Sequence, residues 1–405
     1  NDSTAEFESQ SGNVTLAGSI DDWSVDGTLN LTLPEIRESR FTVSAKGNRD
    51  AVTAKIIDGD VLGGTLSGNA EYSWRSEQHF AANVVADNIQ TSALLPEWPA
   101  TLSGAFDVSG QRLPFSISAN VDDVRGEILD KNLVADGKLE YSDANLLFTD
   151  LRIRHGESSA LLNGNLYSTD GLAYDLSVSE LEHFIPDAAG AALASGRVSL
   201  VGKIPLLRIE GSGKALSYGG VSVAELTITD HATPGSNLDV EITANSATIN
   251  DESVEQLSLR LYVDPEEQSA SAEIVTPRLR SAVSVDGALD NWDEPSNWTG
   301  EIAGFDLQFD DYTAALAAPV ELRASRTQAD LGQYQIIGDH DLTLSGTASW
   351  TAIEGGIVSA ELGAVPLNLV NTFADTRLVF DQTVTGQVSL QMSAAGELSG
   401  RGDIA

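Results

Sequence analysis

Histidines and closely spaced carboxylates are the residues of this 405-residue sequence with the most potential for acid–base or metal chemistry. The histidines are His79, His155, His183, His231 and His340, and no two of them stand at a metal-ligand spacing. Structural zinc sites need close sets of Cys or His ligands, so we expect surface or structural roles for them. Cysteine is absent, which excludes thiolate ligands, thiol nucleophiles and disulfides.

Other short motifs fail at positions that their chemistry requires. The pairs Asp21-Asp22, Asp122-Asp123 and Asp310-Asp311 lack the spaced acids and final glutamate of a calcium loop. The Gly211–Lys214 segment resembles the end of a phosphate-binding loop, but its first glycine is missing and Ala215 replaces the required Ser or Thr. The Gly-x-Ser-x-Gly elbow of hydrolases does not occur. The sequence therefore predicts no enzyme, no metal site and no cofactor.

The charge balance narrows the choice of partners. Lys and Arg total 23 and Asp and Glu total 60, which gives a net charge of −37. Such acidity disfavours attraction to nucleic acid phosphates or to anionic lipid surfaces, so no nucleic acid partner is expected. Hydrophobic residues make up 41% of the chain, which is enough to build a packed structure. The sequence contains no apolar run of about 18 residues, the length that a membrane-spanning helix needs.

Strict alternation of apolar and polar residues dominates the chain, and alternation is typical of strands with one apolar face. Short turn signals such as 58–60, 63–64, 169–171 and 219–220 separate the strands. At roughly one strand and turn per 8–12 residues, more than about 30 strands are expected. The alternating segments include Leu29–Leu33, Phe41–Ala45, Phe115–Val121, Leu172–Val178, Leu238–Ala244, Leu257–Val263, Phe305–Phe309 and Val388–Met392.

Few helices are expected, and the best short candidates are Ser92–Trp98, Leu181–Leu193 and Leu367–Ala374. No proline-rich or charged linker interrupts the alternation, so residues 1–405 are interpreted as one elongated, curled β-sheet trough that grows by adding strands. Loose internal units are expected near 1–95, 96–185, 186–365 and 366–405. The chain ends within the strand pattern, so we interpret it as a piece of a longer protein.

A decayed repeat supports this organisation. Pro96 is followed by a glycine-led strand at Gly104–Gly110, and Pro186 is followed by another at Gly196–Gly202. A third copy runs from Pro366 to Gly386–Leu390. Each unit is interpreted as a short helix, a glycine-led strand and further strands.

These features resemble the TamB family, the inner-membrane subunits of the translocation and assembly module in the AsmA-like group. The segments that carry the resemblance are Trp298–Ile302, Phe305–Leu307, Ala318–Leu322, Leu342–Gly346 with Trp350, Val365–Leu367, and the upstream unit Gly196–Pro205 with Ala215-Leu216 and Val221–Ile228. The similarity covers most of the chain, and the order of these segments is the strongest part of it. The resemblance is to a middle-to-C-terminal portion of such a protein.

The resemblance implies a β-taco-like trough in the periplasm, anchored to the inner membrane, whose apolar groove conducts phospholipid acyl chains toward the outer membrane. It also implies an inner-membrane anchor and an outer-membrane barrel partner of the TamA type, both contacted outside this chain. The alternating residues expected to line the groove are Leu29, Leu31, Leu33, Phe106, Val108, Phe115, Ile117, Leu176, Val178, Val198, Leu200, Leu226, Ile228, Val240, Ile242, Leu259, Leu261, Val283, Val285, Leu307, Phe309, Leu342, Leu344, Val388 and Leu390.

Two alternatives stay open from the sequence. The first is an assembly factor for outer-membrane β-barrel proteins or autotransporters, which would template incoming strands through backbone hydrogen bonds at a sheet edge. The second is a β-rich surface adhesin, which would cover its apolar residues in a closed protein core. A groove open on one face distinguishes the transport hypothesis from the adhesin.

Overall fold

The computed structural model describes residues 8–404 apart from 34–35, 76, 95, 144, 202–204, 234–235, 250–251, 292–296, 367–382 and 394–397. The described chain is almost entirely β: it has 27 strands and three single-turn 3-10 helices at Thr91–Ala93, Leu181–His183 and Asp339–Asp341. The predicted all-β class, with a curled sheet of many strands, is confirmed. The described strands are fewer than predicted because many of them are 11–13 residues long.

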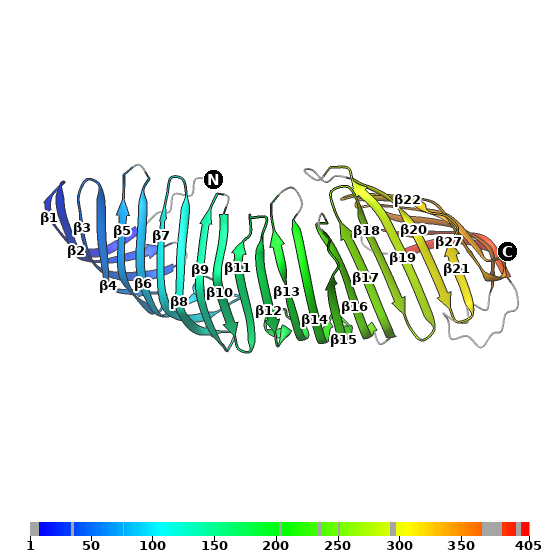
Figure 1. The fold of residues 1–405 in the computed structure, drawn as a ribbon, viewed down its shortest axis with the longest axis horizontal. Helices are drawn as coiled ribbons and strands as arrows, with labels where there is room; N and C mark the ends of the chain where they lie inside the picture. Colours follow the sequence, from blue (N-terminus) through cyan, green and yellow to red (C-terminus); the bar gives the residue numbers. More distant parts are fainter. Residues whose placement is uncertain are drawn as a thin grey trace. The chain divides into compact units, whose positions relative to one another are not determined.

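The chain divides into two units, and the first comprises residues 1–186 and 191–201. Its strands lie side by side in chain order and bend along their length, from blue to green in Figure 1. They are β1 (Glu8–Ser19), β2 (Asp22–Leu33), β3 (Ile36–Gly47), β4 (Ala51–Val61), β5 (Gly64–Ser73), β6 (His79–Gln90), β7 (Ala100–Gln111), β8 (Ser116–Ile128), β9 (Lys131–Ser142), β10 (Asn145–His155), β11 (Ser158–Asn165), β12 (Leu172–Val178) and most of β13 (Ala189–Ser199).

The second unit comprises residues 187–190 and 202–405. Apart from the start of β13, its strands are β14 (Leu206–Tyr218), β15 (Val221–Asp230), β16 (Leu238–Ile249), β17 (Glu252–Val263), β18 (Gln268–Val275), β19 (Leu279–Leu289), β20 (Asn297–Phe309), β21 (Tyr312–Leu316), β22 (Val320–Ser325), β23 (Gln328–Gly338), β24 (Thr343–Thr351), β25 (Gly355–Pro366), β26 (Thr383–Met392) and β27 (Leu398–Ile404). Pairing is antiparallel between chain neighbours, except that β21 and β22 share β20 and β23.

Recurrent β-bulges accompany the bending of the first unit. Register shifts place the extra residues 57–58 in β4, 87–88 in β6, 122–123 in β8 and 149–150 in β10. Bulges bend a strand and increase its twist. The first of these bulges also explains why residues 58–60, predicted as a turn, lie inside β4 instead. The predicted turns at 63–64, 169–171 and 219–220 do lie at or beside strand ends.

The predicted short helices are wrong where the structure describes them. The 92–98 candidate contains only the end of one 3-10 turn, and the 181–193 candidate splits into a 3-10 turn and the start of β13. Pro186 and Gly190 lie inside the second candidate, and both residues disfavour a helix. The third candidate, 367–374, lies outside the described residues. No helix in the described part is long and apolar enough to cross a membrane.

Little of the chain is buried. The chain has a mass of 42.7 kDa and exposes 24862 Å². A compact monomer of this mass would expose about 15,000 Å². The additional exposed area shows that most strands lack a second protein layer on at least one face.

Candidate functional site

Strand register assembles a continuous apolar face in the first unit. Because side chains alternate along a strand, directly paired residues lie on the same face. One row of such pairs crosses all its strands and contains only apolar residues and glycine. This middle row is Leu16, Val25, Ala45, Ala54, Ala70, Ala82, Val108, Ala119, Leu139, Phe148, Gly164, Leu172 and Val198.

The second unit has an equivalent face. One row runs Ile228, Ile242, Leu259, Ala272, Val283 and Phe305, and the adjacent row runs Val240, Leu261, Ala270, Val285, Ile302 and Val320. Farther along, the rows continue through Leu344 and Leu362, and through Ala360 and Val388. These rows contain no charged residue, and Asp230, on the same face as Ile228, stands at the end of β15. The centre of the described face is therefore free of charge.

The predicted groove residues fall on these two apolar faces wherever they lie in a strand and their side chains are described. The register places Leu29, Phe106, Val108, Ile117, Leu176, Val178 and Val198 on the face of the first unit. It places Leu226, Ile228, Val240, Ile242, Leu259, Leu261, Val283, Val285, Leu307, Phe309, Leu344, Val388 and Leu390 on the face of the second unit.

The remaining five predicted residues have less regular positions. Phe115 lies in the turn before β8, Leu200 directly follows β13, and Leu342 directly precedes β24. Leu31 and Leu33 belong to β2, but the structure describes only the backbone of these two residues.

Most of the predicted residues are half-buried or exposed, as an uncovered face requires. Phe115 is 46% exposed and Leu390 is 42% exposed, whereas Val240 is only 4% exposed. Large apolar side chains left open to solvent normally mark a binding surface. Val240 differs because its neighbours cover it, so this residue contributes to packing rather than to open surface.

The sequence interpretation missed the alanines of the middle row and a set of glycines beneath aromatic rings. A Cβ built on Gly47 would stand 2.2 Å from the Trp23 ring, and one on Gly287 would stand 2.3 Å from the Trp298 ring. Each ring therefore lies across the backbone of the neighbouring strand instead of projecting from the sheet. The alternation of apolar and polar residues could have predicted that these alanines lie on the apolar face. The ring–glycine pairs could not be predicted, because they depend on the register between neighbouring strands.

The opposite face of the sheet is polar and carries most of the ion pairs within strands. Arg260 Nε lies 3.2 Å from Asp239 Oδ1, and Lys138 Nζ lies 2.6 Å from Glu140 Oε1. Near one strand end, the Tyr262 hydroxyl donates a 2.6 Å hydrogen bond to Asp264. That bond raises the pKa of Tyr262 to about 12 and lowers the pKa of Asp264. The polar face thus faces water, while the apolar face lacks comparable partners.

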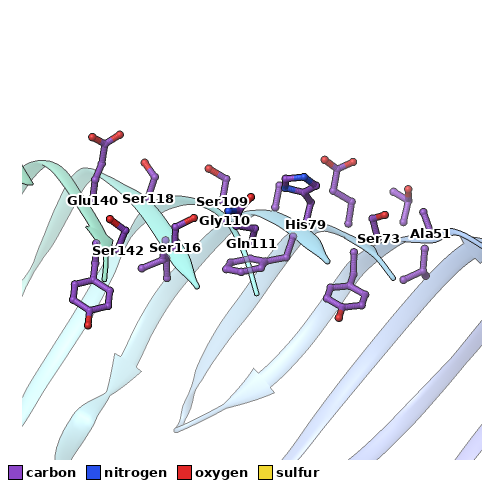
Figure 2. Close-up of a pocket in the computed structure, with 18 of the residues that line it drawn as sticks. Ala51, Ser73, His79, Ser109, Gly110, Gln111, Ser116, Ser118, Glu140 and Ser142 are labelled. Carbon is purple, nitrogen blue, oxygen red and sulfur yellow. The ribbon is translucent and has the colours of Figure 1, made fainter. Parts of the chain in front are cut away.

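A hollow of about 700 Å³ lies at one end of strands β4 to β10 in the first unit. Figure 2 shows Glu140, Ser118 and Ser109 on one side of the strands, with aromatic rings on the other. Its lining includes the apolar-face residues Tyr72 and Tyr141. Most of its lining residues, such as Glu71, Ser109 and Ser118, belong to the polar face, so the hollow lies mainly on that side, at the strand ends where the two faces meet.

The residues with metal or acid–base potential do not converge. Among the described residues, no three His, Asp or Glu side chains are arranged to hold a metal ion. The His155 ring, which is buried, hydrogen-bonds the Ile128 carbonyl oxygen at 2.8 Å and lies edge-on to Phe184. Its surroundings are those of a structural histidine.

Serially paired strands with one apolar and one polar face define an open β-sheet scaffold that offers extended apolar surface. The family model described as TamB, N-terminal domain, matches residues 2–400. The chain therefore belongs to the TamB family. This family is AsmA-like and is part of the translocation and assembly module. The matched model describes the N-terminal domain, whereas the resemblance in the sequence was to a middle-to-C-terminal portion.

Proposed function

We propose that the apolar face is a groove that binds phospholipid acyl chains and conducts them across the periplasm between the inner and outer membranes. The observation that carries this proposal is the continuous row of apolar residues that crosses the first unit. The corresponding rows of the second unit support it.

The energetics suit transport along the rows. Moving an acyl CH₂ group from water onto apolar surface contributes about 0.8 kcal/mol. Because one row succeeds the next without a central charge, neighbouring positions offer similar binding free energies. A chain held in this way can slide from one strand to the next without crossing a large barrier.

The other hypotheses make different demands on the molecule. An adhesin with a closed core would bury its apolar residues, but Leu390 and Trp350 on the apolar face are 42% and 37% exposed. An assembly factor would bind incoming strands through sheet edges, so its cross-links would concentrate on edge backbone rather than on the apolar face. The proposed partners are an inner-membrane anchor and an outer-membrane barrel protein, both contacted by parts outside this chain.

Site-specific photocross-linking tests the proposal. A photoreactive amino acid is placed at Val283 or Val285 on the apolar face, and at Ser284 or Asp286 as matched controls on the polar face of β19. We expect phospholipid adducts at the first two positions and few at the controls. Equal labelling of all four positions, or polypeptide adducts alone, would contradict lipid binding by this face.

A further inference from the structure

Aromatic residues of the first unit concentrate at one end of the strands. The turns after β1, β3, β5, β7, β9 and β11 lie at the same end, because each antiparallel strand reverses direction. Among the described residues, this aromatic rim comprises Trp23, Tyr72, Trp74, Phe80, Phe115, Tyr141 and Tyr167. The turns at the opposite rim carry Trp98 and Phe184.

The chemistry of these side chains suits a boundary between apolar and aqueous surroundings. Tyr and Trp combine an apolar ring with a polar tip, which is why they collect where lipid meets water. The Tyr72 hydroxyl donates to Gln78 Oε1 at 3.3 Å, and Trp74 Nε1 donates to the Arg49 carbonyl oxygen. Their rings remain next to the apolar face while their polar tips meet the turns.

Three successive turns of this rim each carry an arginine. Arg49 pairs with Asp21, and Arg75 pairs with Asp50 at 2.9 Å. Arg112 differs, because within the described residues its guanidinium bonds only the neutral Gln78 Oε1, at 3.3 Å.

Glu77, an acidic residue of the adjoining turn, has another side-chain partner. The Glu77 carbonyl oxygen accepts a hydrogen bond from the Leu113 N–H, while the Glu77 carboxylate pairs with His79 at 2.6 Å. In a chain with 60 acidic residues, an exposed guanidinium without a carboxylate partner is complementary to an external anion.

We propose that Arg112 binds the phosphodiester of a glycerophospholipid whose acyl chains lie on the apolar face, an inference that rests on the proposed function. The Phe115 and Tyr141 rings, with centroids 6.1 Å apart, stand beside the glycerol ester region. Phe80 and Ile117, which the register places on the apolar face of β6 and β8, begin the apolar path for the acyl chains. Bound lipids thus share one orientation across the first unit, with headgroups at the aromatic rim.

Single cysteines can report this orientation because the chain has none of its own. Ser142→Cys reports the aromatic rim, Ser92→Cys the opposite rim, and Ala119→Cys the middle row. A strand of 12 residues separates the two rims by about 40 Å. Each cysteine receives a bimane fluorophore, and the protein is loaded from phosphatidylcholine vesicles that carry a nitroxide on either the headgroup or the acyl chain.

We expect the acyl nitroxide to quench Ala119→Cys and the headgroup nitroxide to quench Ser142→Cys about threefold more than Ser92→Cys. Absence of acyl quenching at Ala119→Cys would contradict the proposed function itself. Acyl quenching there, together with equal or stronger headgroup quenching at Ser92→Cys, would overturn only the orientation proposed here.

The role of Arg112 is tested on the Ser142→Cys background. Arg112→Gln should reduce headgroup quenching at least twofold, while Arg112→Lys should retain most of it. Acyl quenching at Ala119→Cys should stay unchanged in the same variants, which shows that the sheet is intact. Arg125→Gln, on the polar face of β8, is the matched control. Unchanged headgroup quenching in Arg112→Gln, or an equal loss in Arg125→Gln, would overturn the assignment of Arg112.

Discussion

The apolar face is open in one part of the molecule and packed in another. In the first unit, Ala54 is half-buried and pairs with two other alanines, Ala45 and Ala70. In the second unit, Ala244 is 3% exposed and pairs with Leu226 and Leu257. The same residue type is thus accessible among small neighbours and covered among large ones. Alternation defines the face, but the size of cross-strand neighbours determines whether that face is free to bind.

The largest expected effect comes from a charge in the packed part. Val240→Asp should destabilise the second unit by about 3 kcal/mol or more, because it buries a carboxylate without a partner. Leu307→Asp, on a half-buried position of the same face, should cost less stability but abolish lipid cross-linking. Chemical denaturation measures both free energies of unfolding.

The control for Val240→Asp is Glu241→Lys, on the polar face of the same strand. It disrupts only a partly exposed pair with His231, at 3.0 Å, and should change stability by at most about 1 kcal/mol. Equal destabilisation by Val240→Asp and Leu307→Asp would remove the distinction between packed and open parts.

Filling the open part should affect binding more than stability. Ala82→Phe adds a large side chain to the middle row of the first unit, so we expect a severalfold loss of cross-linked phospholipid without a lower melting temperature. Val85→Phe enlarges an exposed side chain on the polar face of β6 and should leave lipid capture unchanged. If both variants capture lipid normally, the middle row is not the path.

A smaller effect is expected where a ring covers a glycine. Gly47→Ala forces the Trp23 ring away from the neighbouring backbone and should cost about 1–3 kcal/mol. The same substitution in a Trp23→Ala background should cost less, because the ring that it displaces is gone. Thermal or denaturant unfolding of the four proteins measures this coupling, and equal costs in both backgrounds would show that the ring is not involved.

Sequence alone could predict the fold class and the face, because alternation such as that of Leu257–Val263 is local information. It could not predict that Val240 is covered or that Trp23 lies on Gly47, since both facts depend on cross-strand register. The helix predicted at 181–193 failed because Pro186 and Gly190 outweighed the helical spacing of apolar residues. Residues 58–60, predicted as a turn, lie at the bulge at 57–58 instead, because aspartate and glycine favour both structures.

The smallest expected effect concerns pH. The pKa of Tyr262 is raised to about 12 by its hydrogen bond to Asp264, so its stabilising contribution is complete below about pH 10 and is lost as pH rises through 12. The pKa of Asp264 is lowered, so its contribution is present above about pH 4 and is lost as pH falls through the lowered value.

Ultraviolet titration of tyrosinate should show a step near pH 12 that Tyr262→Phe removes. Burial also raises the pKa of Tyr334, and this substitution leaves that effect untouched. Tyr218→Phe, at an exposed residue of β14, is the control and should leave that step in place. An unchanged step near pH 12 in Tyr262→Phe would contradict the assignment.

An experimental structure of the protein purified with its bound lipids tests the central claim most directly. We predict rod-shaped acyl-chain density along the apolar face, in contact with Leu259 and Val283 in the second unit and with the alanines of the middle row in the first. A second layer of protein over that face, or ordered water in place of lipid, would contradict the account.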